Sequence, residues 1–575
     1  MKSMYNKLYT EAGERLKSDP TLIPWEEYPR PHLRRAEWMN LNGTWEFETE
    51  SGYSGRIRVP FCVESLLSGV EIKNELGRVA YGEKLIYKRK FTVPEGWRGK
   101  RVMLRYTASR KSELTVNGVS FDGGDSAYFA VCRDITEALR DGENEIEIEC
   151  VNDLDPAYPY GKQKIKRGGM WYTPCSGLWQ TVWLEPVPEE HASEIVTKQE
   201  GNEQVVYVTW QKPDRVGGAD GAVYCEGKKY KLKNGVCRIA FTHPRLWSPE
   251  EPNLYEFTVR AGQDEVKSYF AFRTIETKTI NGVPRICLNG RPYFFNGLLD
   301  QGYFSDGLWT PAEPAEYERD ILKMKSLGFN MLRKHIKIEP ELFYYYCDKL
   351  GMAVFQDMVN NGRYRFFRDT LLPTLGIQKL DDRLINRSGR ARAVFLGHIR
   401  STVSLLSSHP CIVYWTIFNE GWGQFAADEA YAALKKLDGT RVIDSTSGWF
   451  RRKNTDVESL HIYFKKLKLG ADEKKPRVIS EFGGYVYKDA AHSFNLKKTY
   501  GYRIFGSRDE FVKGLRGLYE ELLPLIPRGL CAAVYTQVSD VEDETNGLLT
   551  YDRRLIKLSP EELRFLADAV REFNG

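Results

Sequence analysis

Short strand-like runs of alternating or continuous apolar residues dominate the first third of the chain. Between about 36 and 186 they recur as TWEFE, GRIRVP, LIYKRKFTV, RVMLRYTA, SELTVNGV, NEIEIEC and QTVWLEPV, with turn signals such as Asn117-Gly118 between them. Strands of this length and spacing predict an all-β sandwich of the jelly-roll type. The preceding residues, 1–35, are of mixed polarity and end with EEYPRPHLRR, which predicts an irregular arm laid over this domain.

A second and smaller set of strand-like runs follows between about 187 and 274. The runs include EQVVYVTWQ, CRIAFT, LYEFTVRA and KSYFAFRT. Their number and length are typical of an immunoglobulin-like sandwich, although no Cys…Trp…Cys framework marks a true immunoglobulin domain.

The pattern changes after residue 275, where strand-like runs alternate with helical stretches to the end of the chain. Eight parallel-type strands over about 300 residues have the size and rhythm of a (β/α)8 TIM barrel. The segments after the fifth and sixth strands are short for full helices, so those two units are expected to be degenerate. We expect domains at 1–186, 187–274 and 275–575, barrel strands at 293–300, 329–335, 352–358, 412–419, 441–447, 459–463, 477–482 and 530–537, and helices at 314–327, 339–350, 388–407, 424–437, 509–524 and 559–573.

Charge and cysteine usage exclude several classes of function. The 83 basic and 78 acidic residues nearly balance, so nothing in the charge requires nucleic acid or an anionic membrane as a partner. The ten Cys are scattered without a CxxC pair, and no His cluster has zinc-ligand spacing. The first residues lack the apolar core of a secretory signal, and no run reaches the length of a membrane span. These features predict a cytoplasmic protein with reduced thiols and without a metal or other cofactor.

Acidic residues stand at the C-terminal ends of several predicted barrel strands, where TIM barrels place their reacting groups. Asp300, Asp357, Glu420 and Glu481 are the candidates. A carboxylate at the end of an apolar strand is costly to bury unless it is paired or used. For each one alone, a helix cap or an Arg partner is the structural alternative. Because strands four and seven lie across the barrel mouth from one another, Glu420 and Glu481 could flank a single bond.

Two carboxylates about 5–5.5 Å apart are what a retaining glycosidase needs. One of them attacks the anomeric carbon and must be ionised. The other first gives a proton to the leaving oxygen and then accepts one from water. The pair therefore predicts a retaining glycoside hydrolase at the barrel mouth.

The segments FNEGWGQF (418–425) and ISEFGGY (479–485) resemble the acid/base and nucleophile segments of glycoside hydrolase family 2, which includes β-galactosidases, β-glucuronidases and β-mannosidases. The resemblance extends over nearly the whole chain and implies a jelly roll, an immunoglobulin-like sandwich and a TIM barrel, with retention of configuration. The further matching segments are EYPRP (27–31), LNGTWEF (41–47), VPFCVES (59–65), NGVSFDGG (117–124), GKQ (161–163), SGLWQTVWLE (176–185), FAFRTIE (270–276) and LNGRPYFFNG (288–297).

The resemblance also implies roles for individual residues. Glu420 resembles the acid/base and Glu481 the nucleophile. Asn419 resembles the Asn that contacts the sugar 2-OH, and Arg333 the strand-two Arg that steadies the nucleophile. Core packing is the alternative for Tyr463 and Trp422. The full set of expected substrate-binding residues is Asp300, Arg333, His335, Asn419, Trp422, His461 and Tyr463.

One departure from familiar members lies on the second strand. Those members have a His three residues after the strand-two Arg, but position 336 is Ile. His335 instead follows two residues after Arg333, on the same face of the strand.

A second departure concerns the recognition of a uronate carboxylate. β-Glucuronidases carry an Asn-x-Lys signature after strand eight, whereas Asn546 is followed here by Gly and Leu. Lys334, Lys337, Arg363 and Arg365 lie near the loops of strands two and three and could supply another clamp, but we interpret them as surface charge.

The leading prediction is a retaining exo-β-glycosidase that releases terminal, non-reducing β-linked sugars, with a β-galactoside as the default sugar and a neutral hexoside preferred to the matching uronide. The alternative is a β-hexuronidase, acting on β-glucuronides or β-galacturonides. A non-catalytic carbohydrate-binding protein of the same fold is the weakest reading, because both carboxylates and Asn419 are present. The expected partner is a small glycoside or oligosaccharide, and a homo-oligomer is compatible with the sequence.

Overall fold

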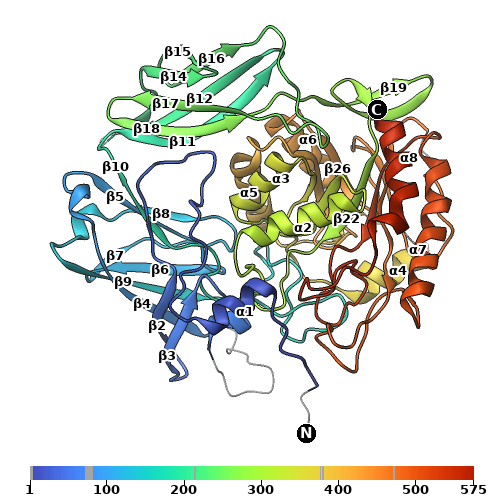
Figure 1. Cartoon of the computed structure of the whole chain (residues 1–575), viewed down its shortest axis with the longest axis horizontal. Coiled ribbons are helices and arrows are strands. Elements are labelled where there is room, and N and C mark those ends of the chain that lie inside the picture. The colour runs from blue at the N-terminus through green and yellow to red at the C-terminus, as the bar shows by residue number, and fades with distance from the viewer. Residues whose placement is uncertain (1–3, 71–81, 213–214, 376, 378–380, 471–472) are drawn as a thin grey trace.

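The computed structural model describes residues 4–70, 82–212, 215–375, 377, 381–470 and 473–575. A blue and cyan sandwich, a green sandwich and a yellow-to-red barrel lie against one another (Figure 1). This multidomain fold class is the one predicted. The domain boundaries at 186 and 274 stay a prediction.

The first sandwich is built from two antiparallel sheets that share one apolar core. Alternation along its strands sets the inner face: in β9, Asn144, Ile146, Ile148 and Cys150 are buried and the residues between them are more exposed. One sheet has the order β3-β2-β4-β9-β6-β7 and the other β1-β10-β5-β8. The strands are β1 (Met39–Asn40), β2 (Gly43–Thr49), β3 (Ser54–Val59), β4 (Lys84–Thr92), β5 (Arg101–Tyr106), β6 (Lys111–Val116), β7 (Val119–Phe121), β8 (Val131–Asp134), β9 (Glu143–Val151) and β10 (Trp183–Val187).

The second sandwich also pairs two antiparallel sheets. In one, β12 lies between β11 and both β13 and β16; the other has the order β15-β14-β17-β18. A three-stranded sheet, β19-β20-β21, follows it and leads into the barrel. The strands are β11 (His191–Glu200), β12 (Glu203–Gln211), β13 (Val216–Gly217), β14 (Gly221–Cys225), β15 (Lys228–Leu232), β16 (Val236–Ala240), β17 (Tyr255–Ala261), β18 (Asp264–Phe270), β19 (Ile275–Ile280), β20 (Val283–Leu288) and β21 (Arg291–Pro292).

Eight parallel strands in the order β26-β25-β24-β23-β22-β31-β28-β27 form the barrel. Each predicted strand is present, with ends that differ by at most two residues. They read as continuous apolar runs because a parallel sheet is covered on both faces. The strands are β22 (Phe295–Asp300), β23 (Met331–Lys334), β24 (Ala353–Asp357), β25 (Ile412–Asn419), β26 (Val442–Ser447), β27 (Glu458–Ile462), β28 (Arg477–Gly483) and β31 (Leu530–Thr536).

All six predicted helices cover the outside of the barrel, and the described residues after β26 and β27 contain no helix, so the two degenerate units are confirmed for that part of the chain. The helices are α2 (Ala315–Ser326), α3 (Glu341–Leu350), α5 (Gly389–Leu406), α6 (Ala427–Leu437), α7 (Arg508–Leu522) and α8 (Arg564–Asn574), with the short α4 (Leu372–Thr374), β29 (Tyr485–Val486) and β30 (Arg503–Ile504) in the loops.

The prediction of an irregular N-terminal arm is wrong for one segment, since α1 (Glu11–Ser18) is a helix. Thr10 caps it by accepting a hydrogen bond from the Gly13 N–H. The Thr10 hydroxyl and N–H in turn donate to Asp306 of the barrel, each at 2.8 Å. The helix is thus fixed by a barrel residue far away in the sequence.

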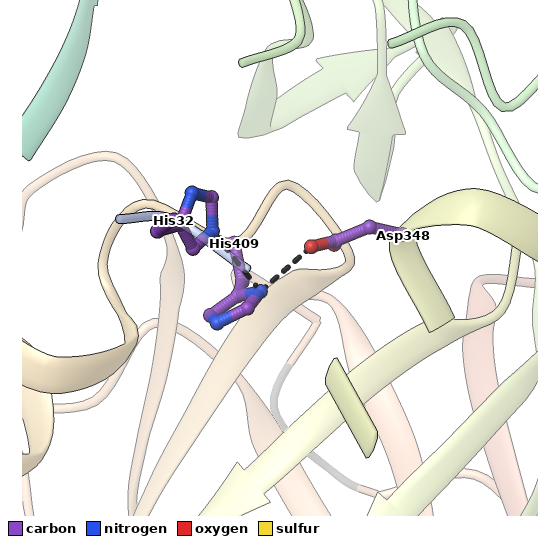
Figure 2. A group of neighbouring side chains, drawn as sticks. All are labelled: His32, Asp348 and His409. Carbon is purple, nitrogen blue, oxygen red and sulfur yellow. Dashed lines mark hydrogen bonds and ion pairs between the residues drawn. The ribbon is translucent and has the colours of Figure 1, made fainter. Parts of the chain in front are cut away.

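A buried polar cluster joins the arm, the second sandwich and the barrel. His32 of the arm, Asp348 of α3 and His409, just before β25, meet there (Figure 2). Asp348 Oδ2 lies 2.6 Å from His409 Nδ1 and accepts the Tyr269 hydroxyl at 2.7 Å, while Oδ1 accepts the N–H of Cys411. Burial lowers the pKa of His32, so its ring is neutral. The cluster holds these segments together at the end of the barrel where strand β25 begins.

All ten cysteines are free thiols. No helix among the described residues has the length and apolar composition needed to cross a bilayer.

Replacing Asp348 tests the role of this junction. Asp348→Ala leaves the Tyr269 hydroxyl and the Cys411 N–H without an acceptor in a dry interior, so we expect a loss of about 3 kcal/mol in the free energy of unfolding. Urea denaturation followed by fluorescence measures it. Asp141→Asn, on the exposed surface of the first sandwich, is the matched control and should change nothing. If the two variants unfolded at the same urea concentration, the role of Asp348 in holding this junction would be contradicted.

Candidate active site

The predicted carboxylates meet at the C-terminal end of the barrel. Glu481 lies within β28, and Glu420 follows directly after β25. One carboxylate oxygen of each and a ring nitrogen of His461 all lie within 4.8 Å of one another. Two carboxylates this close can act on a single anomeric carbon, as the nucleophile and the acid/base of a retaining glycosidase do.

Glu481 is buried and held in the ionised form. Arg333 Nη1 donates to its Oε1 at 3.1 Å, and the Tyr463 hydroxyl donates to its Oε2. Burial by itself would raise the pKa of Glu481, but the charges of His461 and Arg333 and the Tyr463 hydrogen bond outweigh it and lower the pKa to about 2. The carboxylate therefore carries its charge at any ordinary pH.

Glu420 is held more loosely and faces solvent on one side. Its side chain is 22% exposed, and its Oε1 lies 2.8 Å from His461 Nδ1. The backbone at Glu420 has φ +53°, a left-handed conformation that is uncommon for a residue with a side chain. Glu481 and Glu420 raise the pKa of His461 against the opposing effect of burial. His461 Nε2 contacts the Ser447 hydroxyl at 3.2 Å, which fixes the ring between the two acids.

Arg333 organises the floor of the site. Its Nε donates to Asp357 Oδ1 at 3.0 Å, and its Nη2 to Asn419 Oδ1 at 2.9 Å. His335 Nδ1 lies 2.9 Å from the second oxygen of Asp357. Burial and then the charge of Lys162 lower the pKa of His335, so the ring is neutral. The structure thus brings the expected residues of strands two, three, four and seven into one network.

Trp422 forms a wall between the barrel and the first sandwich. Its Nε1–H donates to the Gly362 carbonyl at 2.9 Å, and its ring packs edge-on against Trp171 and Tyr160 of the first sandwich. Because the side chain is only 4% exposed, most of the ring is used in packing.

Asp300 is the expected site residue that the structure keeps apart from the two carboxylates. Its carboxylate accepts Lys334 Nζ at 2.6 Å and the Gly302 N–H at 2.9 Å. No described contact links it to Glu420 or Glu481.

The interpretation of Lys334 and Lys337 as surface charge is wrong. Both are buried, and their ammonium groups each lie 2.9 Å from a different oxygen of Glu339. Strand alternation sends Lys334 to the face opposite Arg333, between the strand and its helix. These cations neutralise buried acids and are not available to a ligand.

A group of polar residues around the last strand was missed by sequence reasoning. Glu544, in the loop after β31, is buried and accepts the Tyr172 hydroxyl of the first sandwich. Burial raises the pKa of Glu544, and Lys162 opposes that effect. The dense acidic run DVEDE (540–544) and the motif GKQ (161–163) were the available signals, but nothing in the sequence brings these two segments together.

The first sandwich covers part of the barrel mouth with its segment 160–173. The N–H groups of Tyr160 and Gly161 donate to the Asn360 carbonyl, in the loop after β24. Arg167 lies 3.4 Å from Glu542 and 3.3 Å from Asp543, in the loop after β31. The segment is thereby attached at two places on the rim of the barrel.

Two groups of side chains among the described residues have the donor types that a metal ion takes: Glu420, His461 and Glu481, and the junction cluster around Asp348. In both, the carboxylate already has partners. Both oxygens of Glu481 are engaged by Arg333 and Tyr463, and both oxygens of Asp348 accept hydrogen bonds. Hydrogen bonding alone therefore accounts for each arrangement.

Comparisons with known proteins agree with the fold. Residues 192–273 match a family model described as glycosyl hydrolases family 2, and residues 283–488 match the family 2 TIM barrel domain. A putative β-glucuronidase of Formosa agariphila is 24% identical over 76% of this chain and 40% of that protein. A β-galactosidase of Aeromonas hydrophila is 26% identical over 64% of this chain and 36% of that protein. The chain thus spans less than half the length of either relative.

Solved structures align over almost the whole chain. A β-D-glucuronidase of Dictyoglomus thermophilum has a TM-score of 0.73 and 18% identity, covering 95% of this chain and 98% of its own. A β-glucuronidase of Ruminococcus gnavus in complex with D-glucuronic acid has a TM-score of 0.68 and 17% identity, covering 95% and 100%. At these identities the likeness establishes the shared fold alone.

The hydrogen bond that Tyr463 donates stabilises the ionised form of Glu481. In Tyr463→Phe the carboxylate loses a donor that favours its charged form, so its pKa should rise from about 2. A carboxyl ¹³C NMR titration, with Glu481→Gln to assign the signal, measures the shift. Tyr207→Phe, on the second sandwich, is the control and should leave the titration unchanged. An unaltered pKa in Tyr463→Phe would mean that Arg333 and His461 alone set the charge.

Proposed function

This chain belongs to glycoside hydrolase family 2, and we propose that it is a retaining exo-β-glycosidase with Glu481 as nucleophile and Glu420 as acid/base. The observation that carries the proposal is the close pair of carboxylates with unequal surroundings. Glu481 is buried under an Arg and a Tyr donor, whereas Glu420 is partly exposed and paired with a single His. Unequal environments are what separate a nucleophile from a proton donor.

In the first step Glu481 attacks the anomeric carbon while Glu420 gives its proton to the leaving oxygen. The products are a covalent glycosyl ester on Glu481 and the released aglycone. In the second step the ionised Glu420 takes a proton from water, and the resulting hydroxide equivalent displaces Glu481 from the anomeric carbon. Two inversions give net retention of the β configuration.

The neighbours of the two acids have distinct parts in this cycle. Arg333 and Tyr463 stabilise the Glu481 carboxylate before attack and after its release. His461 lies 2.8 Å from Glu420 and can share a proton with it, so it supports the ionised acid/base during the second step. Asn419, held by Arg333, is positioned next to Glu420 to contact the sugar, as the family resemblance implies.

Exo action is supported by the way the first sandwich is attached to the barrel rim. The segment 160–173 is bonded to the loops after β24 and β31, and a chain-internal sugar would need an open groove on both sides of the catalytic pair. A site that this segment covers on one side would accept a terminal sugar.

For the sugar, we propose a β-hexuronide as the first candidate and a β-galactoside as the second. Relatives of both names align with the chain, and the solved structures that align with it, described above, are β-glucuronidases. This reverses the order expected from sequence, where the absence of the Asn-x-Lys signature favoured a neutral hexoside. A non-catalytic sugar-binding role is disfavoured, because such a protein has no need of the buried charge on Glu481.

The acid/base assignment predicts a dependence on the leaving group. Glu420→Ala should slow hydrolysis of alkyl β-glycosides by about 10²–10⁴-fold and of dinitrophenyl β-glycosides far less, since only poor leaving groups need a proton. Added azide should restore turnover and give a β-glycosyl azide, which NMR identifies. Glu420→Gln is the matched isosteric variant. An α-azide, or equal losses on all leaving groups, would refute the proposal.

A further inference from the structure

We propose that Lys162 is the cation that holds the substrate's carboxylate and so makes the site selective for uronides. The inference rests on the retaining β-glycosidase activity proposed above and adds to it the residue that selects the sugar. Lys162 lies in the segment 160–173 of the first sandwich, so the selecting residue is supplied to the barrel by another domain.

Lys162 is half-buried and has no ion-pair or hydrogen-bond partner for its ammonium group among the residues that the structure describes. Its Nζ lies 5.9 Å from the centroid of the Tyr172 ring. It lines a small cavity together with Gln301 and His335. A half-buried cation without a counterion is stabilised when a ligand brings a negative charge close to it.

The cavity that Lys162 lines adjoins the catalytic network. His335, which also lines it, lies 2.9 Å from Asp357, and Arg333 donates to both Asp357 and Glu481. The charge of Lys162 is the largest electrostatic influence on both His335 and Glu544, and both of these residues also respond to the charge of Glu481. Lys162 therefore belongs to the same part of the barrel mouth as the network around Glu481.

The order of the barrel strands gives the side of the sugar that Lys162 faces. Its cavity is lined by residues that follow β22 and β23, which lie across the ring of eight strands from β26 and β27. His461 comes from β27 and contacts Glu420, which must face the leaving group. Lys162 consequently lies on the side of the site opposite the leaving group, where the terminal sugar itself is bound.

Other cations near the mouth are paired or exposed to solvent. Lys334 and Lys337 pair with Glu339, and Arg333 pairs with Glu481. Arg363 and Arg365 are exposed to solvent.

Glu544 is a buried acid that could repel a uronate held by Lys162. Burial raises its pKa, and Lys162, the Tyr172 hydroxyl and Gln537 oppose that rise. An incoming carboxylate would favour the neutral form further, and a neutral Glu544 can donate a hydrogen bond to it. In its neutral form Glu544 would thus add one donor beside the charge of Lys162.

The test compares kcat/KM for the nitrophenyl β-glucuronide, β-galacturonide, β-glucoside and β-galactoside. Lys162→Met should lower kcat/KM on the preferred uronide by about 10–100-fold, the value of a charge-assisted hydrogen bond, and leave the neutral hexosides within about threefold. Lys162→Arg should keep most of the preference. Lys166→Met, which removes the same charge from an exposed position of the same segment, is the control and should match the parent on all four.

Equal losses on uronides and hexosides leave the uronide-to-hexoside ratio unchanged. That result would show that Lys162 only packs against its neighbours and would overturn the inference. The ranking in the parent enzyme tests the proposed sugar separately, because a selective loss in Lys162→Met counts for the inference whichever sugar ranks first. Calorimetry with D-glucuronate and D-glucose on Glu481→Gln, with and without Lys162→Met, gives the same comparison without turnover. There too, glucuronate affinity should fall while glucose affinity stays, and no change would contradict the proposal.

Discussion

The buried guanidinium of Arg333 is the interaction on which the site depends. It joins Asp357, Asn419 and Glu481, which come from three different strands, and only 1% of it is exposed. A charge at that depth is tolerable because two carboxylates and two neutral acceptors surround it. Its charge in turn helps to keep the carboxylates of Asp357 and Glu481 ionised. Charge pairing inside the barrel thus fixes Glu481 at the position from which it faces the sugar.

Around this core, chemistry and selectivity come from different parts of the chain. The barrel strands supply both acids and their hydrogen-bonding partners. The first sandwich supplies Tyr172, the aromatic ring of Trp171 and the ammonium group of Lys162 by laying one segment over the rim. Because the segment is bonded to loops after two separate strands, a change in the sandwich can alter which sugar is bound without disturbing the catalytic pair. This division agrees with catalysis on rigid strands and specificity on the loops above them.

Much of the fold and the centre of the site could be predicted from the sequence, because continuous apolar runs end in polar residues at the barrel mouth. That rule located all eight strands and the pairing of Glu420 with Glu481. It failed where a structure depends on partners distant in the chain. Helix α1 is capped through Asp306 of the barrel, and Lys334 is buried against Glu339 although its sequence neighbours suggest a surface. Glu544 and Lys162 escaped notice for the same reason, since nearly 400 residues separate the two segments that meet.

The central claim is that Glu481 forms a covalent bond to the sugar. A 2-deoxy-2-fluoro β-glycoside with a good leaving group slows the second step more than the first, so the intermediate accumulates. Mass spectrometry of the intact protein should then show one added fluoroglycosyl group, and peptide mapping should place it on Glu481, with no label in Glu481→Gln. A label on Glu420 or on another residue, or full turnover without any trapped intermediate, would contradict the account.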